Sequence, residues 1–286
     1  MKKFMALVLA TVATFATLAF ASCGAKKDEL KVYDTFLLTK EDYAFAIAKE
    51  NTALKASVDE LVLDMKEDGS LDALISSYFD GTATFTYTNK TSTPAENDFV
   101  MATNAFFPPF EYYEGEAFAG VDVEMAYLIA QKLGKNLFVK DMDFDGITLD
   151  VANGDSDIGM AGMTVTEKRL QQVAFAESYY TSAQVITVQK GDKDFENCKS
   201  AEDVVAVLKG KNSKYKIGTQ TGTTGYMYSA GDVDFGYDGF KNLETKAYQT
   251  GALAMTDLSN GKINAVILDL QPSLMIAKSI NANFAK

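Results

Sequence analysis

Apolar residues recur three and four positions apart between residues 52 and 79, which is the spacing of one face of an amphipathic helix. Gly69 interrupts this pattern, so the sequence predicts a helical stretch with a break near its middle. Residues 43–48, just before it, are apolar and aromatic and predict a strand. The apolar positions of the helical pattern are Leu54, Val58, Leu61, Val62 and Met65 before the glycine and Leu71, Leu74, Ile75 and Tyr78 after it.

From residue 99 onward, short apolar strands alternate with helical stretches, and this rhythm predicts an α/β fold with a parallel or mixed sheet. Asn-Gly turns at residues 153–154 and 260–261 each stand between a helix end and an apolar strand, and aligning them places Gly162 opposite Asp269. We therefore expect two similar lobes that present corresponding strand ends to each other. The expected strands are 99–103, 137–142, 157–161, 215–218 and 265–268, and the expected helices include 121–133 and a helix after Thr224.

Residues 81–97 show neither pattern. They are rich in threonine, contain Pro94 and have no clear amphipathic helix. This composition is typical of a linker, so we expect residues 81–97 to be a flexible connection.

The chain begins with a targeting signal. Lys2 and Lys3 precede a mostly apolar run over residues 4–20, which is short for a membrane span. The sequence Phe20-Ala21-Ser22-Cys23 resembles a bacterial lipobox. The resemblance implies removal of the signal before the cysteine and acylation of its thiol, whereas plain secretion with an incidental cysteine is the alternative.

This interpretation divides the start of the chain at the lipobox. Residues 1–22 would be a signal peptide and Cys23 the lipidated residue. The polar residues 23–31 would form a tether. Cys198 would then have no cysteine partner and would be a structural or inert thiol.

Composition excludes several classes of function. The chain has 286 residues and is 47% apolar, enough for a sizeable core. Its net charge of −12 and pI near 4.6 argue against a nucleic-acid partner, which requires a basic surface. The absence of histidine excludes Ser-His-Asp and Cys-His catalysis and the usual zinc sites with imidazole ligands.

Arg169 stands near the start of a predicted helix, a position that disfavours a cation. Thr166 is a plausible helix N-cap, which would place Arg169 in the first helical turn, where a cation opposes the helix dipole. A guanidinium can grip a carboxylate with two parallel hydrogen bonds, so this position favours a binding role. A surface arginine that pairs with Glu167 or Glu177 is the structural alternative.

Three further stretches offer binding chemistry, each with a structural alternative. Residues 220–225 follow a strand and expose backbone N–H groups that can hold an anion, or they form an ordinary turn. Asp269 stands at a strand end, where its carboxylate suits an ammonium group or caps a loop. The aromatic residues within 105–113 could form a pocket wall, although most of these rings must pack in a core.

Together these motifs resemble the extracytoplasmic binding proteins of polar amino-acid ABC importers, bacterial solute-binding protein family 3. The resemblance covers nearly all of residues 99–286 and implies a two-lobed, type II periplasmic-binding-protein-like α/β fold with the ligand between the lobes. The matching stretches are 102–112, which includes Phe107-Pro108-Pro109-Phe110-Glu111, then 120–123, 142–146, 161–169, 179–185 and 218–225.

The chain departs from the family in the order of its segments. The family normally continues past the Asp269 region into a strand and two helices, whereas this sequence ends at Lys286. Residues 38–80 resemble that closing segment, so we expect a circular permutation that has moved it to the front. An unrelated helical leader is the alternative. The implied lobe one spans 38–186 and comprises the moved segment 38–80, the linker 81–97 and the usual first half 98–186. The implied lobe two comprises 187–286 plus 32–37. The hinges between the lobes would lie near 36–39 and 186–190.

The resemblance also assigns roles to residues at matching positions. Arg169 would hold the ligand's α-carboxylate, and Asp269 its α-ammonium group. Relatives with cationic ligands often carry an acid at the position of Asn104, so the asparagine places a strictly basic ligand in doubt. The implied ligand-binding set is completed by backbone groups at Gly162, Thr164 and Thr224, the sandwiching rings of Phe107 and Phe144, the side-chain readers Asn104 and Gln220, and Thr223.

The implied function is that of a receptor and not of an enzyme. We expect a lipid-anchored extracytoplasmic protein that binds a free polar L-amino acid and delivers it to the permease of an ABC importer. No cofactor, metal or nucleic acid is expected. The alternatives are an enzyme on this fold, resembling cyclohexadienyl dehydratase, and a ligand-sensing domain. The lack of histidine and of paired acids argues against the enzyme. A ligand-sensing domain would need a transmembrane and signalling segment after the fold.

Overall fold

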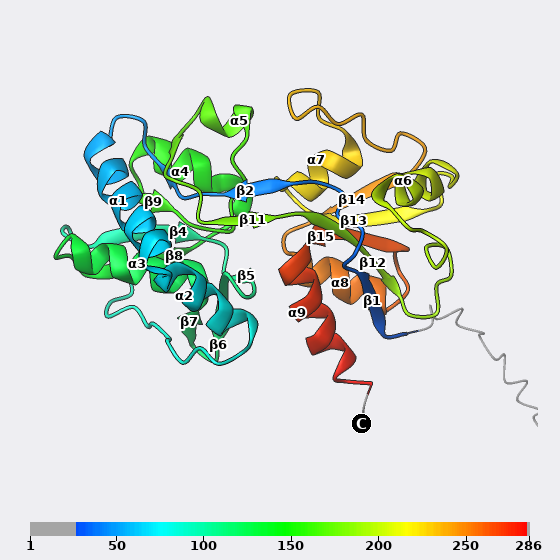
Figure 1. Ribbon diagram of the computed structural model, residues 1–286, viewed down its shortest axis with the longest axis horizontal. Coiled ribbons are helices and arrows are strands. Elements are labelled where there is room, and N and C mark those ends of the chain that lie inside the picture. The colour runs from blue at the N-terminus through cyan, green and yellow to red at the C-terminus, as the bar shows by residue number, and fades with distance from the viewer. Residues whose placement is uncertain (1–26, 285–286) are drawn as a thin grey trace, which may run out of the picture.

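Two five-stranded sheets lie at the centres of two lobes (Figure 1). The structure is a computed structural model that describes residues 27–284. In that part of the chain, no helix combines the length and apolar character that a membrane crossing requires. The expected signal peptide at 1–22 and the expected lipidation site Cys23 lie outside the described residues.

The sheet of lobe one has the strand order β10 (Ala174–Phe175), β3 (Ala46–Ile47), β9 (Ile158–Gly159), β4 (Phe99–Thr103) and β8 (Leu137–Asp141). The central strand β4 runs parallel to β8 and β9, while β3 lies antiparallel to β9 and β10. This mixed sheet confirms the α/β prediction. The helices packed on its two faces are α1 (Thr52–Asp68), α2 (Ser70–Phe79) and α3 (Val121–Lys132) on one side and α4 (Ile147–Asn153) on the other.

The apolar pattern between residues 52 and 79 forms α1 and α2. The break at Gly69 is confirmed, because this residue ends α1 with a left-handed φ of 80° that glycine adopts without strain. The apolar faces of both helices are buried against α3 and the strands of lobe one, together with Phe99 and Met101. The strand predicted over 43–48 is divided into β2 (Glu41–Tyr43) and β3. Residues near the start of the chain therefore supply an inner strand and a covering layer of a lobe that residues 98–175 otherwise build.

The sheet of lobe two has the order β1 (Leu30–Tyr33), β12 (Gln184–Gln189), β15 (Ala265–Asp269), β13 (Lys216–Gln220) and β14 (Glu244–Tyr248). β13 runs parallel to β14 and β15, and β12 lies antiparallel to β1 and β15. Alternate residues of β15 face opposite sides, since Ile267 packs with α6 (Ala201–Lys209) while Val266 and Leu268 pack with α8 (Gly251–Ser259). The helices of this lobe are α6 (Ala201–Lys209), α7 (Thr224–Ala230), α8 (Gly251–Ser259) and α9 (Leu270–Asn281).

Two short antiparallel strands connect the lobes, and Figure 1 shows them crossing between the two sheets. They are β2 and β11 (Tyr180–Ser182), in which Tyr43 lies opposite Tyr180. The lobe boundary expected at residue 186, with a hinge at 186–190, needs correction, because β12 pairs along its length with β1 and β15 inside the sheet of lobe two. The chain crosses before Gln184.

Residues 81–97 are irregular as expected, but part of this segment is attached to lobe one. Asn89 makes two hydrogen bonds of 2.8 Å with the backbone of Val139 on β8. Tyr87 donates its hydroxyl to the carbonyl of Leu137 and forms a backbone bridge with Phe118. The expectation of a flexible connection was therefore wrong for residues 87–89, because their polar groups extend the edge of the lobe-one sheet.

The beginning of β1 lies against the end of α9. Leu30 donates its backbone N–H to Oδ1 of Asn281 at 2.7 Å and accepts from Nδ2 of the same side chain at 2.8 Å. The tether expected over 23–31 is thus shorter, because Leu30 and Lys31 already pair with β12. These contacts place the start of the described chain beside its end, on lobe two (Figure 1).

Candidate ligand-binding site

A cavity between the two lobes contains every residue that the sequence assigned to ligand binding. The atom-free space around these residues is about 290 Å³, which includes space open to solvent. The lining residues are Asn104, Phe107, Phe144, Gly162, Thr164, Arg169, Gln220, Thr223, Thr224 and Asp269, together with Glu111 and Ala161.

Arg169 forms one wall of the cavity and is the only arginine in the chain. It lies in α5 (Glu167–Leu170), whose N-cap Thr166 accepts a hydrogen bond from the Arg169 backbone N–H at 3.1 Å, as predicted. The guanidinium donates to the carbonyl oxygens of Thr164 at 2.6 Å and Gly222 at 3.0 Å, so it joins the two lobes.

The structural alternative for Arg169 was wrong. The side chain is buried, and no described carboxylate forms an ion pair with it, while Glu177 pairs with Lys66. Burial lowers the pKa of Arg169 to about 10, although nearby Glu41 and Asp269 oppose this effect, so the group is a cation at neutral pH. A buried cation whose donors meet only carbonyl oxygens is suited to receive a carboxylate.

Asp269 lies at the end of β15 and supplies an acid to the same cavity. It occupies the N-cap position of α9, but its side chain makes no capping hydrogen bond, so the alternative of a loop cap was wrong. Its Oδ1 instead accepts a hydrogen bond from the hydroxyl of Tyr43 on β2. Burial, followed by the charge of Glu41, raises the pKa of Asp269 to about 7.

Glu41 joins the threonines of the cavity wall to the crossing strand β2. This buried carboxylate accepts hydrogen bonds from the hydroxyls of Thr164 at 2.8 Å and Thr224 at 2.7 Å, one from each lobe. Thr39 also donates to it at 2.7 Å. Sequence reasoning missed Glu41, although an acid at the start of an otherwise apolar strand was a usable signal.

Gly162 follows β9, and the spatial correspondence with Asp269 that the paired Asn-Gly turns predicted is confirmed, since both line the cavity. Its φ of 52° is left-handed, and a Cβ atom here would lie 2.7 Å from the ring of Phe107. The Gly162 N–H donates to Asp122 at 2.9 Å. The position therefore requires glycine both for its backbone and for the approach of the ring.

The aromatic residues divide between cavity and core. Phe107 of β5 (Phe106–Phe107) lines the cavity, whereas Phe110 is fully buried in the core of lobe one. Phe144, in the short 3₁₀ helix η1 (Phe144–Gly146), lies 5.2 Å from the Arg169 guanidinium carbon, measured to the ring centroid.

Two amides meet across the lobes at the cavity. Nε2 of Gln220 donates to Oδ1 of Asn104 at 2.9 Å, and Nδ2 of Asn104 donates to the carbonyl of Met142 at 2.8 Å. Because the Asn104 amide nitrogen is engaged, its oxygen is the atom that faces Gln220. A ligand group with hydrogen-bond donors fits such an acceptor.

These features correspond to those of a known family. The family model of bacterial extracellular solute-binding proteins, family 3, matches residues 99–271, which is more than half of the chain. The chain belongs to this family.

Relatives in the solute-binding family carry names that describe amino-acid binding. The arginine-binding extracellular protein ArtP of Bacillus subtilis is 35% identical over 131 residues, which are 46% of this chain and 48% of that protein. A probable histidine-binding protein of Neisseria gonorrhoeae is 31% identical over 190 residues, 65% of this chain and 63% of its own length. The chain thus spans less than two thirds of these curated relatives.

A solved structure of an ancestral arginine-binding protein bound to arginine is also similar. Its TM-score is 0.54 at 34% sequence identity, covering 64% of this chain and 75% of that one. The likeness is consistent with the two-lobed type II fold that the sequence predicted.

The structure also brings together acids that sequence reasoning left apart. Glu111, at the start of β6 (Glu111–Glu114), lines the cavity, and Asp122 of α3 lies behind it. Burial, then the charge of Asp122, raises the pKa of Glu111 well above its usual value, and burial raises that of Asp122 to about 7. The expectation that this solute-binding protein has no paired acids was therefore wrong.

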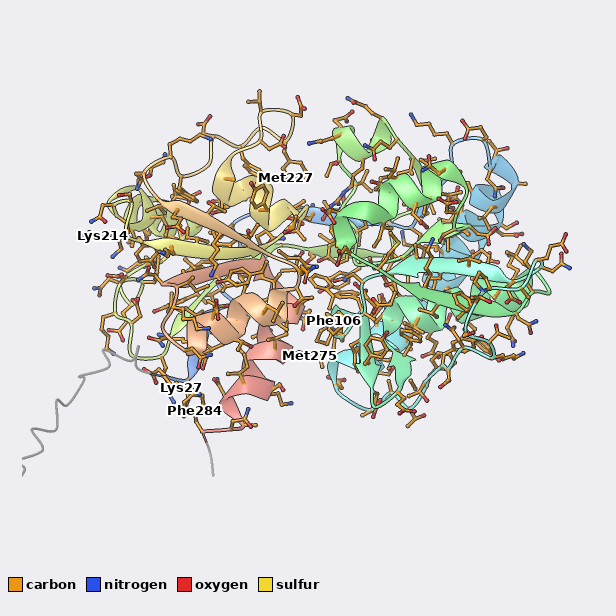
Figure 2. All side chains as sticks on the ribbon, turned by 180° about the vertical axis from the view of Figure 1, so that it is seen from behind. Lys27, Phe106, Lys214, Met227, Met275 and Phe284 are labelled. Carbon is orange, nitrogen blue, oxygen red and sulfur yellow. The ribbon has the colours of Figure 1, made fainter. Side chains whose placement is uncertain are left out.

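A second hollow between the lobes differs in chemistry. It is lined by residues of β5 and β6 and by α8 and α9, with Phe106 and Met275 near the junction of the lobes in Figure 2. None of its lining residues is charged. A zwitterion therefore fits the first cavity and not this one.

Proposed function

We propose that this protein is an extracytoplasmic receptor that binds one free amino acid between its lobes and delivers it to the permease of an ABC importer. The arrangement of Arg169 and Asp269 carries the proposal, because a buried guanidinium and a buried carboxyl line one small cavity. An α-amino acid presents a carboxylate and an ammonium group a short distance apart, and these two charges match that pair.

The binding contacts follow from this orientation. The ligand carboxylate would lie at the Arg169 guanidinium, within reach of backbone groups at Thr164 and Thr224. Its ammonium group would lie at Asp269 and the Gly162 carbonyl. The ligand side chain would extend between Phe107 and Phe144 toward Asn104 and Gln220, with Thr223 completing the wall.

A ligand whose side chain donates hydrogen bonds fits best. The Asn104 oxygen accepts from Gln220, and acids outnumber the one arginine around the cavity. The names of the similar proteins mention arginine and histidine. Arginine is therefore the first candidate, with histidine and glutamine as the comparisons that separate a cationic from a neutral polar ligand.

We also propose that the chain is a circular permutation of its family. The family match begins at residue 99, and residues 41–79 fill a strand and two helices of the lobe that follows them in sequence. The contact of Leu30 with Asn281 supports this interpretation, because joining the described ends there would restore an uninterrupted order.

Anchoring and the absence of catalysis complete the proposal. Acylation of Cys23 would hold the receptor at the outer face of the cell membrane, since a doubly acylated anchor is stable.

Binding without turnover is expected: incubation with prephenate-like substrates should leave them unchanged, and product formation would contradict the receptor function. A thermal-shift screen of the twenty amino acids tests the ligand directly, because a ligand that binds the folded state raises its stability.

A further inference from the structure

Four buried acids surround the cavity, but one of them receives no hydrogen bond from an N–H group or a neutral hydroxyl of the described residues. Glu41 accepts from two threonine hydroxyls, and Asp269 accepts from Tyr43. Asp122 accepts from Gly162 N–H at 2.9 Å and from the Tyr179 hydroxyl at 2.6 Å. Among the described residues, no N–H or neutral O–H group donates to either carboxyl oxygen of Glu111, whose completely buried side chain has a hydrogen bond with the carboxyl of Asp122.

The surroundings of Glu111 disfavour a negative charge there. An ionised carboxylate that is buried without donors loses its hydration and gains nothing in return. The charge that acts most strongly on Glu111 is that of another acid, Asp122. Two adjacent carboxyl groups hold a proton between them because both cannot easily be ionised. Glu124, also on α3, accepts a hydrogen bond from Tyr78. The charged and titratable groups that face Glu111 are Asp122 on α3, Asp269 at the end of β15, Asp141 on β8, Tyr179 and, across the cavity, Arg169.

Glu111 differs from a core acid in its position, because it lines the cavity. A group that enters the cavity can therefore supply the positive charge and the donors that the protein does not. The ammonium group of an amino acid placed at Asp269 would lie on the same side as Glu111, since Asp269 is among the charges that act on Glu111.

We propose that Glu111 is a proton-exchanging part of the ammonium site, a carboxylic acid before the amino acid binds and a carboxylate once the cationic group is seated. The O–H bond of Glu111 breaks in this step and the proton passes to solvent; no other bond changes. This inference rests on the proposed binding of an amino acid. It makes the site one charge more negative in the complex, so it favours ligands with net positive charge over neutral ones.

Calorimetric titration of the full-length protein with arginine at pH 8 tests the inference, in buffers of equal pH but different ionisation enthalpy. At this pH, groups with a pKa of about 7, such as Asp122 and Asp269, are already largely ionised, so a released proton is attributable to Glu111. We expect the wild-type protein to release about one proton more per arginine than Glu111→Gln, which cannot ionise, and the variant to bind about tenfold more weakly.

Glu114→Gln is the matched control, because Glu114 lies on the same strand but is exposed. It should release protons and bind as the wild type does. Equal proton release by wild type and Glu111→Gln, or none by the wild type, would overturn the inference while leaving arginine binding intact. If the wild type bound no amino acid, the proposed function itself would fail.

A second measurement needs no variant and so remains valid if Glu111→Gln does not fold. Infrared difference spectra of the wild type at pH 8 should show loss of a protonated-carboxyl band, and gain of a carboxylate band, when arginine is added. An unchanged carboxyl region on saturation with arginine would refute the proton exchange.

Discussion

Tyr43 donates its hydroxyl to the carboxyl of Asp269, although 226 residues separate them in the chain. Tyr43 lies on the crossing strand β2, and Asp269 ends β15 at the interlobe cavity. The early segment of the chain therefore does more than complete a lobe, because it holds one of the charged groups of the candidate site. Removing that segment should disable the site as well as the fold.

Arg169→Ala should remove most amino-acid binding. The ligand carboxylate would lose a bidentate partner in a desolvated cavity, and truncating one side of such a pair costs about 2–5 kcal/mol. Calorimetry with arginine checks this, with Lys214→Ala on lobe two as a control of equal charge change. Binding of Arg169→Ala within ~1 kcal/mol of the wild type would contradict the carboxylate clamp.

Gly162→Ala should destabilise the protein and weaken binding, because the new Cβ would lie 2.7 Å from Phe107 at a φ of 52°. Gly154→Ala is the matched control, since its φ of 78° is also left-handed but no atom lies within 4 Å of an added Cβ. The control should lose about 1–2 kcal/mol from backbone strain alone, with unchanged affinity. Equal losses of stability and affinity in the two variants would show that the approach of Phe107 to Gly162 is unimportant.

The ligand-free protein should lose stability as pH rises from about 4 to about 7. Asp122 and Asp269 have pKa values raised to about 7 by burial, so the folded state binds more protons than the unfolded state over this interval, and the free energy of unfolding falls with pH. Asp269→Asn removes one of these ionisations. Denaturant unfolding at pH 8 should show this variant to be about 1–4 kcal/mol more stable than the wild type while it no longer binds arginine. A less stable Asp269→Asn protein at pH 8 would contradict this account of the buried acid.

A rearranged chain tests the permutation. It would begin at residue 97, run to 286 and continue with residues 27–80, so that the contacts among these residues are kept and only those of residues 81–96 are lost. We expect it to fold and to bind with unchanged affinity. The loss of the hydrogen bonds that Asn89 and Tyr87 make with lobe one should lower its stability by about 0.5–1.5 kcal/mol for each bond. Failure of the rearranged chain to fold would argue against the permutation, and so would cooperative folding and normal ligand binding by the fragment 97–286.

Cys23→Ser should release the protein from membranes, because acylation of its thiol is the proposed anchor. Fractionation of cells that express the wild type and the variant would measure this. A variant that still sediments with the membrane fraction would exclude Cys23 as the anchor.

The sequence predicted the parts of this structure that local patterns encode. The break at Gly69, the strand over 99–103 and the N-cap Thr166 were each visible in residue order and type. Arg169 was recognisable because a cation in the first turn of a helix runs against the dipole. Such features depend only on neighbouring residues.

Asp269 was predicted, but Glu41 and the pairing of Glu111 with Asp122 were missed because these depend on residues far away in the chain. Glu41 is satisfied by Thr164 and Thr224, more than a hundred positions distant, and nothing near Glu41 in sequence indicates those partners. The attachment of residues 87–89 was missed for the same reason, since Asn89 finds its partner on β8. The hinge at 186–190 was misplaced because the apolar run of β12 does not reveal which sheet it joins.

Titration of the purified wild-type protein with arginine, followed by the melting temperature, tests the central claim most directly. Binding of one arginine in the interlobe cavity should stabilise the folded state by about 2.7 kcal/mol at a free ligand concentration 100 times Kd, and the melting temperature should rise by a few degrees. Neutral amino acids such as glutamine should shift it less, and Arg169→Ala should not respond. The absence of a shift with any of the twenty amino acids, or a shift of equal size in Arg169→Ala, would contradict the account.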